Sequence, residues 1–149
     1  MTDPSIPEPL RRELVGELMD ARRAVGAAKR ASDALAERRA RDRVQSAKVA
    51  LGERGPKWWE GHDEADWRVR VKACLVTLLR ARDPDVGVGP EDAARAAGGD
   101  DWWARLATAV EIGAALEADG RIVARSIAGA DGVGAPDGVR LHRGPRFDA

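Results

Sequence analysis

This 149-residue chain has two histidines and one cysteine, the residue types that most often bind metal ions or act in catalysis. His62 opens the tripeptide HDE, which places three metal-ligating side chains next to one another. A metal site needs ligands whose spacing lets the side chains converge on one ion. Adjacent residues do not provide that spacing, and no second histidine or cysteine lies nearby. We therefore predict no metal site at His62 or at His142.

Nucleophilic and phosphate-transfer chemistry also lack a recognisable pattern. Cys74 lies in the apolar run VKACLVTLL, and apolar surroundings raise the pKa of a thiol and make it unreactive. The glycines in GVGPED and GADGVG lack the Gly-Lys-Ser/Thr context of a phosphate-binding loop. We therefore predict a protein that is not an enzyme and that needs no cofactor.

The charged residues are balanced in total but not along the chain. There are 25 basic and 25 acidic residues, so no global field draws the protein toward a polyanion. Between residues 21 and 57, however, eleven basic residues stand against four acidic ones, a net charge of +7. Between residues 83 and 119, nine acidic residues stand against two basic ones, a net charge of −7. Binding to a charged partner must therefore come from local surfaces.

Five tryptophans and no tyrosine make up an unusual aromatic set. A tryptophan buries about 150–250 Å² and can keep its indole N–H at a wet edge. We predict that Trp58, Trp59 and Trp67 staple two halves of the protein together. The alternative is that one ring of each adjacent pair points outward and binds a base or a partner protein. Of Trp102 and Trp103, one is expected in the core, and Trp103 is the candidate surface anchor.

Residues 5–57 have the pattern of an antiparallel helical hairpin. Ser5 and Glu8 predict a capping-box start, and an apolar residue then recurs every three or four positions. This first stripe consists of Leu10, Leu14, Leu18, Ala21, Val25 and Ala28. Ser32 and Asp33 are good N-cap residues for a second helix, whose stripe consists of Ala36, Ala40, Val44, Ala47 and Leu51 and which ends at Gly52. Both stripes are narrow, so the hairpin needs another surface to pack against.

Residues 67–143 have the element order of a winged helix, reached through a tryptophan-rich junction at 58–66. ADWRVRVKACLVTLLRARD predicts a helix that ends before Asp83-Pro84, and PEDAARAAGG predicts one that starts at Pro90. DDWWARLATAVEIGAALEADG predicts a third helix, capped by Asp100 or Asp101, with an apolar stripe at Trp102, Leu106, Ala109, Val110, Gly113 and Leu116. RIVARSI and VRLHR predict two strands joined by a loop rich in glycine, aspartate and proline.

The predicted fold class is therefore mainly α: a helical hairpin packed on a winged helix of three helices and a two-stranded β-wing. Residues 144–149 form a tail, and whether Phe147 docks is open. GPEDAARAAGGDDWW, ADGRI and GVRLHRG resemble a family of bacterial winged-helix domains known only as a domain of unknown function, over about residues 68–144. ELMDARRAVGAAKR and AKVALGERGPKWWEG resemble short uncharacterised proteins of high-GC bacteria. Neither resemblance implies a catalytic residue.

The winged-helix expectation suggests duplex DNA as the partner, with an unusual contact surface. A recognition helix normally presents Arg, Lys, Asn or Gln to the major groove, but the third helix begins with two aspartates and offers only Arg105. We therefore expect the wing and the hairpin to contact the phosphates, as in a small regulator or a nucleoid-associated factor. The candidate DNA-binding residues are Arg121, Arg125, Arg140 and Arg143 of the wing and Arg22, Arg30, Arg39 and Arg43 of the hairpin.

The alternative function is a protein-interaction adaptor for a basic partner. Its candidate residues are Trp103, Asp100, Asp101 and Arg105. The two charge blocks can also meet within one molecule or head to tail between two copies, as in a homodimer. The single cysteine, the absence of a signal-peptide pattern and the absence of about 18 consecutive apolar residues predict a cytoplasmic protein without membrane contact.

Overall fold

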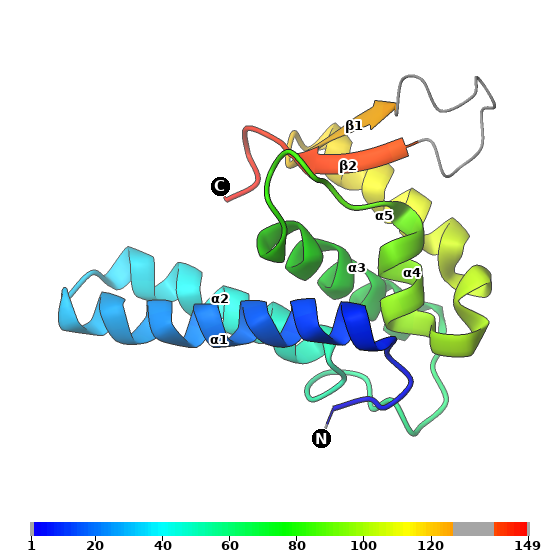
Figure 1. Cartoon of the computed structure of the whole chain (residues 1–149), viewed down its shortest axis with the longest axis horizontal. Helices are drawn as coiled ribbons and strands as arrows, with labels where there is room; N and C mark the ends of the chain where they lie inside the picture. Colours follow the sequence, from blue (N-terminus) through cyan, green and yellow to red (C-terminus); the bar gives the residue numbers. More distant parts are fainter. Residues whose placement is uncertain (1, 127–138, 149) are drawn as a thin grey trace.

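A computed structural model of the chain describes residues 2–126 and 139–148 (Figure 1). The chain forms helices, then a short antiparallel ribbon. The elements are α1 (Glu8–Arg30), α2 (Ala34–Ala50), α3 (Glu64–Ala81), α4 (Pro90–Gly98), the 3-10 helix η1 (Gly99–Arg105), α5 (Leu106–Ala118), β1 (Ile122–Ser126) and β2 (Val139–Arg143). The predicted loop between the strands falls on residues 127–138, outside the described residues.

The α1–α2 hairpin is present, with a different start from the predicted one. Ser5 does not cap α1: Pro7 precedes the helix without a side-chain cap, and the Ser5 hydroxyl instead donates to Asp3. Asp33 is confirmed as the N-cap of α2, where its carboxylate accepts from the Ala36 N–H at 3.0 Å. Gly52 follows α2 with a φ of 78°, a left-handed conformation that glycine adopts without steric cost.

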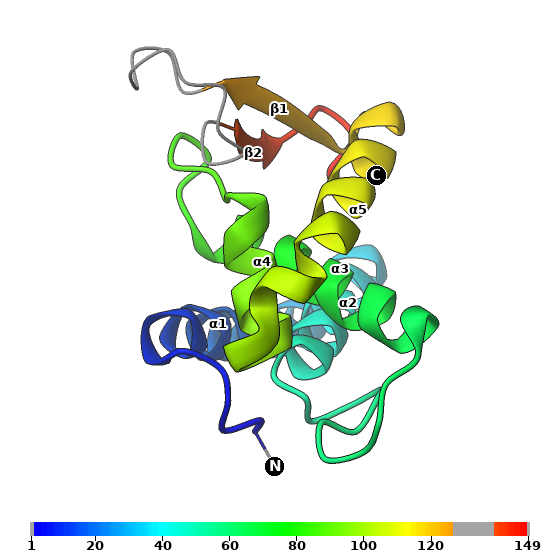
Figure 2. The same ribbon diagram turned by 90° about the vertical axis from the view of Figure 1, so that its right-hand side faces the viewer.

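Helix α3 supplies the surface that the thin hairpin needs. It lies between the hairpin and the C-terminal elements in both views (Figures 1 and 2), and it contacts α1 and α2 as well as α4 and α5. A capping box between Asp63 and Asp66 starts the helix, and Asp83-Pro84 follows it as predicted. One hydrophobic core joins Leu14 of α1 with Leu75 of α3 and Ile112 of α5.

The connection between α4 and α5 is longer than the predicted helix starts imply. The third helix was expected to begin at Asp100 or Asp101, but residues 99–105 form η1, and α5 begins only at Leu106. Gly99 has a φ of 58° and Asp101 has non-helical dihedrals of −99° and 25°, which interrupts the α-helix. The predicted stripe is wrong at Val110, whose side chain is 49% exposed, while Ile112 is buried in its place.

The two strands pair as expected, with Ala124 opposite Leu141. Leu141 also exchanges two backbone hydrogen bonds with Val88, both of 2.8 Å, which ties the ribbon to the segment before α4. The tail that follows β2 is docked. The Phe147 ring is buried, and the guanidinium groups of Arg80 and Arg143 each lie 5.7 Å from it. The C-terminal residues therefore cover one end of α3.

Candidate anion-binding groove

The arginines predicted to bind DNA fall into two groups. Five of them are exposed: Arg22, Arg30, Arg39, Arg121 and Arg125. The other three, Arg43, Arg140 and Arg143, are partly buried and have partners within the protein. Arg140 has the longest of these contacts, with its Nη1 3.4 Å from the Asp92 carboxylate.

Arg43 forms a two-pronged ion pair across the hairpin. Its Nε and Nη2 donate to the two carboxylate oxygens of Glu17 at 2.9 and 2.8 Å. Glu17 is only 3% exposed, so the pair is shielded from water on one side. The hydrogen bonds from Arg43 to Glu17 raise the pKa of Arg43. Its charge is therefore already compensated, and the prediction that Arg43 is a free phosphate-binding residue needs correction.

Arg143 serves the end of α3. Its guanidinium donates to the backbone carbonyls of Leu79 and Arg80 at 2.9 Å and of Arg82 at 3.2 Å. The last carbonyls of a helix have no partner within the helix, and a basic side chain can satisfy them. Arg143 is therefore a structural cap, and its predicted place among the DNA-binding residues needs the same correction.

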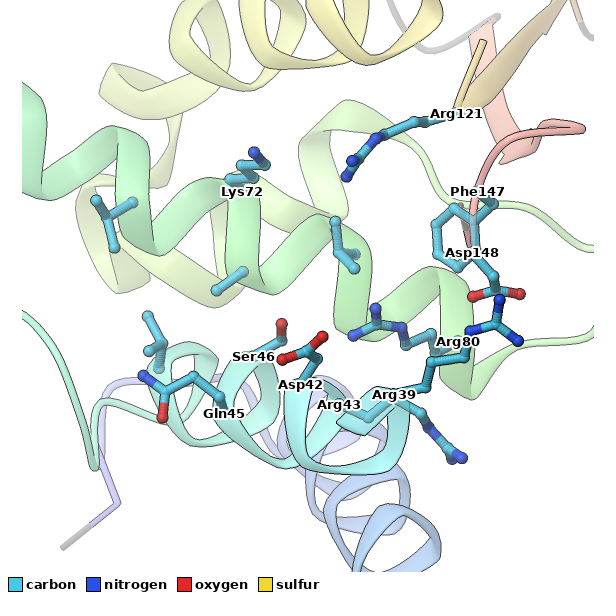
Figure 3. Close-up of a pocket in the computed structure, with 14 residues that line it drawn as sticks. Arg39, Asp42, Arg43, Gln45, Ser46, Lys72, Arg80, Arg121, Phe147 and Asp148 are labelled. Carbon is cyan, nitrogen blue, oxygen red and sulfur yellow. The ribbon is translucent and has the colours of Figure 1, made fainter. Parts of the chain in front are cut away.

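A groove with a cavity volume of about 460 Å³ runs between α2 and α3 and ends at the C-terminal residues (Figure 3). Helix α3 contributes one face at spacings of three and four residues, and α2 the opposite wall. We call it the cationic groove and define it by its charged residues: Arg39, Asp42, Arg43, Lys72, Arg80, Arg121 and Asp148. Its uncharged lining includes Val49, Val69, Ala73, Val76 and Phe147.

The groove has a charged end and a largely uncharged end. Figure 3 shows Arg39, Arg43 and Arg80 gathered near Asp148, while Gln45 lies toward the opposite end. The two helices run antiparallel here, so the start of α2 lies beside the end of α3. Sequence reasoning singled out Arg39 and Arg121 but missed Lys72 and Arg80. Their spacing of eight residues, which brings both to nearly the same side of α3, was the available signal.

Arg80 is the unusual residue of the groove. Its Nε and Nη1 atoms are buried and have no hydrogen-bond partner among the described residues. Burial lowers the pKa of Arg80, because a low-dielectric environment disfavours the charged form. The residue as a whole is only partly buried, and its guanidinium lies 5.7 Å from the Phe147 ring centre.

The tryptophans divide as the alternative interpretation predicts. Trp103 is 67% exposed and Trp59 is 56% exposed, whereas Trp102 packs against the core. Trp58 is partly buried and lies over Gly52, at the end of the hairpin. The staple prediction is therefore wrong for Trp59.

Trp67 joins different elements from those expected. It stacks on His62 with ring centroids 4.6 Å apart, and the Arg105 guanidinium lies 4.1 Å from its ring centre. It thus links the junction to η1. Arg105 is accordingly turned toward Trp67, while the candidate interaction residues Asp100 and Asp101 are exposed.

The remaining chemically capable residues have structural surroundings. Cys74 is confirmed as a core residue with no exposed surface, and burial raises the pKa of its thiol to about 12. His142 is buried, and its Nδ1 donates to the Pro84 carbonyl at 2.8 Å. Within residues 2–126 and 139–148, no group of three or more His, Cys, Asp or Glu side chains is arranged to hold a metal ion.

Among the described helices, none has the length and apolar character needed to cross a bilayer. Residues 68–127 match the model of a family described as a protein of unknown function (DUF3253). This confirms the predicted similarity to a domain of unknown function over that range, which includes α4, η1, α5 and β1 but not the hairpin. No curated protein and no solved structure matches the chain.

Proposed function

We propose that this protein binds duplex DNA through the cationic groove and the surface around it, as a small regulator or nucleoid-associated factor. One observation carries the proposal. Arg39 of the hairpin and Arg121 beside β1 are far apart in the sequence, yet they line the same groove together with Lys72 of α3. Phosphate contacts by Arg and Lys supply most of the affinity of such proteins for DNA.

We also propose that α3, α4, α5 and the ribbon form a winged helix. The support is their order, three helices followed by two antiparallel strands. In this arrangement the usual recognition helix would begin near Asp100 and Asp101, which are exposed and would repel phosphates. The cationic groove therefore replaces the recognition helix as the DNA-contacting surface.

The DNA proposal predicts a salt-sensitive interaction that depends on the groove. Fluorescence anisotropy of a labelled random duplex, measured over a salt series, is expected to show binding at low salt. In the variant Arg39→Glu/Arg121→Glu the dissociation constant should rise at least about ten-fold at low salt, and the slope of log K against log salt should fall by about one per lost phosphate contact.

The matched control reverses the same number of charges outside the groove. Arg12 and Arg23 are exposed on α1 and, among the residues that the structure describes, pair only with neighbours on that helix. Arg12→Glu/Arg23→Glu should therefore change the dissociation constant much less than the groove variant. Equal losses in the two variants would show that total charge and not the groove governs binding, and a flat signal for the wild type would refute the proposal.

A second candidate function, a protein-interaction adaptor for a basic partner, is favoured by the 67% exposure of Trp103. Large exposed aromatic rings anchor protein interfaces, and Asp100 and Asp101 beside it are exposed. Among the described residues, no ion pair joins the basic block at 21–57 to the acidic block at 83–119 (the pairs nearest to doing so are Arg82 with Asp92 and Arg68 with Glu111). Among these residues, the two blocks therefore do not neutralise each other through ion pairs.

The adaptor function predicts that Trp103→Ala abolishes capture of a basic partner and leaves the melting temperature nearly unchanged, because little buried surface is lost. Trp59→Ala is the matched control, since Trp59 is similarly exposed but lies outside the acidic surface. Pull-down with each variant, followed by quantification of the same partner, tests the prediction. If Trp59→Ala reduces capture equally, the acidic surface is not the binding surface.

A further inference from the structure

We infer that the cationic groove is a binding site for a small molecule carrying a dianionic phosphate, with Arg80 as the residue that holds the phosphate. This inference rests on the groove assigned in the proposed function and names a second class of ligand for it. Three properties of the groove support it: its size, its net charge, and the difference between its charged end and its largely uncharged end.

The size suits a small molecule better than a duplex. Its volume of about 460 Å³ falls in the range of small-molecule sites, roughly 300–1,000 Å³. Such a site is concave and encloses much of its ligand, whereas the backbone of a duplex is itself a wide convex ridge. The deep part of the groove is therefore more accessible to a free phosphate group than to one within a duplex.

The charge favours a dianion. Arg43 is neutralised by Glu17 behind the groove, which leaves four lining cations: Arg39, Lys72, Arg80 and Arg121. Asp42 and Asp148 are the two lining acids, so the uncompensated charge is about two positive units. A phosphate monoester carries close to two negative charges at neutral pH, and a phosphodiester carries one.

Arg80 is placed to receive the phosphate. Arg80 lines the groove, and its Nε and Nη1 have no hydrogen-bond partner among the described residues. A phosphate bound beside it would supply the missing counter-charge. The lining continues away from Arg80 along α3 to Val76 and Val69, with Val49 opposite on α2. A ligand with its phosphate on Arg80 would lay its uncharged body against these valines.

Asp148 is a resident competitor for the phosphate. Its carboxylate lies near Arg80 (Figure 3) and influences both Arg80 and Arg43 electrostatically. An incoming phosphate must overcome this negative charge. Removing it should therefore strengthen anion binding, an effect opposite to that of removing Arg80.

The test is isothermal titration calorimetry of the full chain with methyl phosphate, a monoester that is dianionic at about pH 8, at constant ionic strength. Dimethyl phosphate, the monoanionic diester, serves as the comparison probe. We expect one methyl phosphate per chain and much weaker binding of dimethyl phosphate. Arg80→Gln should weaken methyl phosphate binding at least about ten-fold, and Asp148→Asn should strengthen it by a few fold. Arg12→Gln, outside the groove, should have no effect.

Folding and DNA binding are measured on the same samples. Arg80→Gln loses the contact with the Phe147 ring but no hydrogen bond on its buried nitrogens, so the melting temperature should change little. Unchanged methyl phosphate affinity in Arg80→Gln, or equal affinity for dimethyl phosphate, overturns the inference. If duplex DNA binds and depends on Arg39 and Arg121 while methyl phosphate does not bind, the inference fails and the proposed function stands. If methyl phosphate binds through Arg80 and DNA does not, the proposed function fails alone.

Discussion

Replacing Asp3 with alanine is expected to lower the free energy of unfolding by about 3–5 kcal/mol, because it leaves a buried arginine without its counter-ion. Asp3 and Arg70 are 3% and 1% exposed, and their closest charged atoms are 2.5 Å apart. Arg70 lies inside α3, where water cannot take over the role of the carboxylate. Urea-induced unfolding followed by circular dichroism measures the loss.

The pair also fixes the N-terminal segment to the rest of the protein. Asp3 accepts from the backbone N–H of Ser5 at 2.9 Å and from its hydroxyl at 2.7 Å. The Asp3 N–H donates to the Leu51 carbonyl at 2.8 Å. The segment before α1, the end of α2 and the middle of α3 therefore meet at Asp3. This explains why so large an effect is expected from a residue near the start of the chain.

A double-mutant cycle separates the ion pair from the surrounding contacts. Asp3→Asn and Arg70→Met should each be strongly destabilising, whereas the double variant should be less destabilised than the sum of the two, because both buried charges are then gone. Losses that simply add would show that the two side chains contribute independently, contrary to the prediction.

Acid should reveal the same interaction. Burial alone would raise the pKa of Asp3, but hydrogen bonds from Ser5 and the charge of Arg70 outweigh it and hold the pKa below its ordinary value of 3.8. A lowered folded-state pKa contributes stability that is fully present above the unfolded value and is lost as the pH falls through the folded one. The urea concentration at the unfolding midpoint of the wild type should therefore decrease as the pH drops below about 4. Asp3→Asn should lack this part of the decrease.

Local patterns predicted the helices well, and long-range contacts account for most of the differences. The apolar spacing of α1 placed Leu10, Leu14 and Leu18 in the core, where they lie. The N-cap at Asp33 also follows from residues a few positions away. In contrast, Ser5 was assigned to a local capping box, but its hydroxyl is bound by Asp3, and Asp3 is held in turn by α3. A capping rule based on neighbouring residues does not take account of this contact between Asp3 and α3.

The site shows the same division. The basic character of α2 and the arginine beside β1 could be read from the sequence, but their meeting in one groove depends on how α3 packs between them. Arg143 looked like a free wing residue and instead caps a helix whose last residues are more than sixty positions earlier. The sequence does not distinguish an exposed arginine from one that is bound within the protein, and the tertiary structure is needed to tell them apart.

Arg82 follows α3 and connects three parts of the fold. Its Nε and Nη2 donate to the two carboxylate oxygens of Glu13 on α1 at 2.6 and 3.0 Å. Its Nη1 donates to Asp92 on α4 at 2.8 Å and to the Gly87 carbonyl at 3.2 Å. The hydrogen bond to Glu13 is the main cause that raises the pKa of Arg82, so the side chain stays charged throughout the accessible pH range.

Arg82→Ala is accordingly expected to lower the free energy of unfolding by about 2–5 kcal/mol, the range for removing one partner of a hydrogen-bonded, largely desolvated charge pair. Arg82→Lys should recover only part of this loss, because an ammonium group cannot reproduce the planar fork that reaches Glu13 and Asp92 together. The control is Arg12→Ala, which breaks an exposed pair with Glu8 and should cost less than about 1 kcal/mol.

Chemical denaturation of the three variants in parallel decides the prediction. If Arg82→Ala loses no more stability than Arg12→Ala, the bonds to α1 and α4 are dispensable, and the hydrophobic core alone holds the hairpin against the C-terminal elements. If Arg82→Lys is as stable as the wild type, the positive charge alone is sufficient and the shape of the guanidinium is not needed. The expected order, wild type above Arg82→Lys above Arg82→Ala, requires both, and it would make Arg82 the polar counterpart of the core that α3 shares with both halves of the protein.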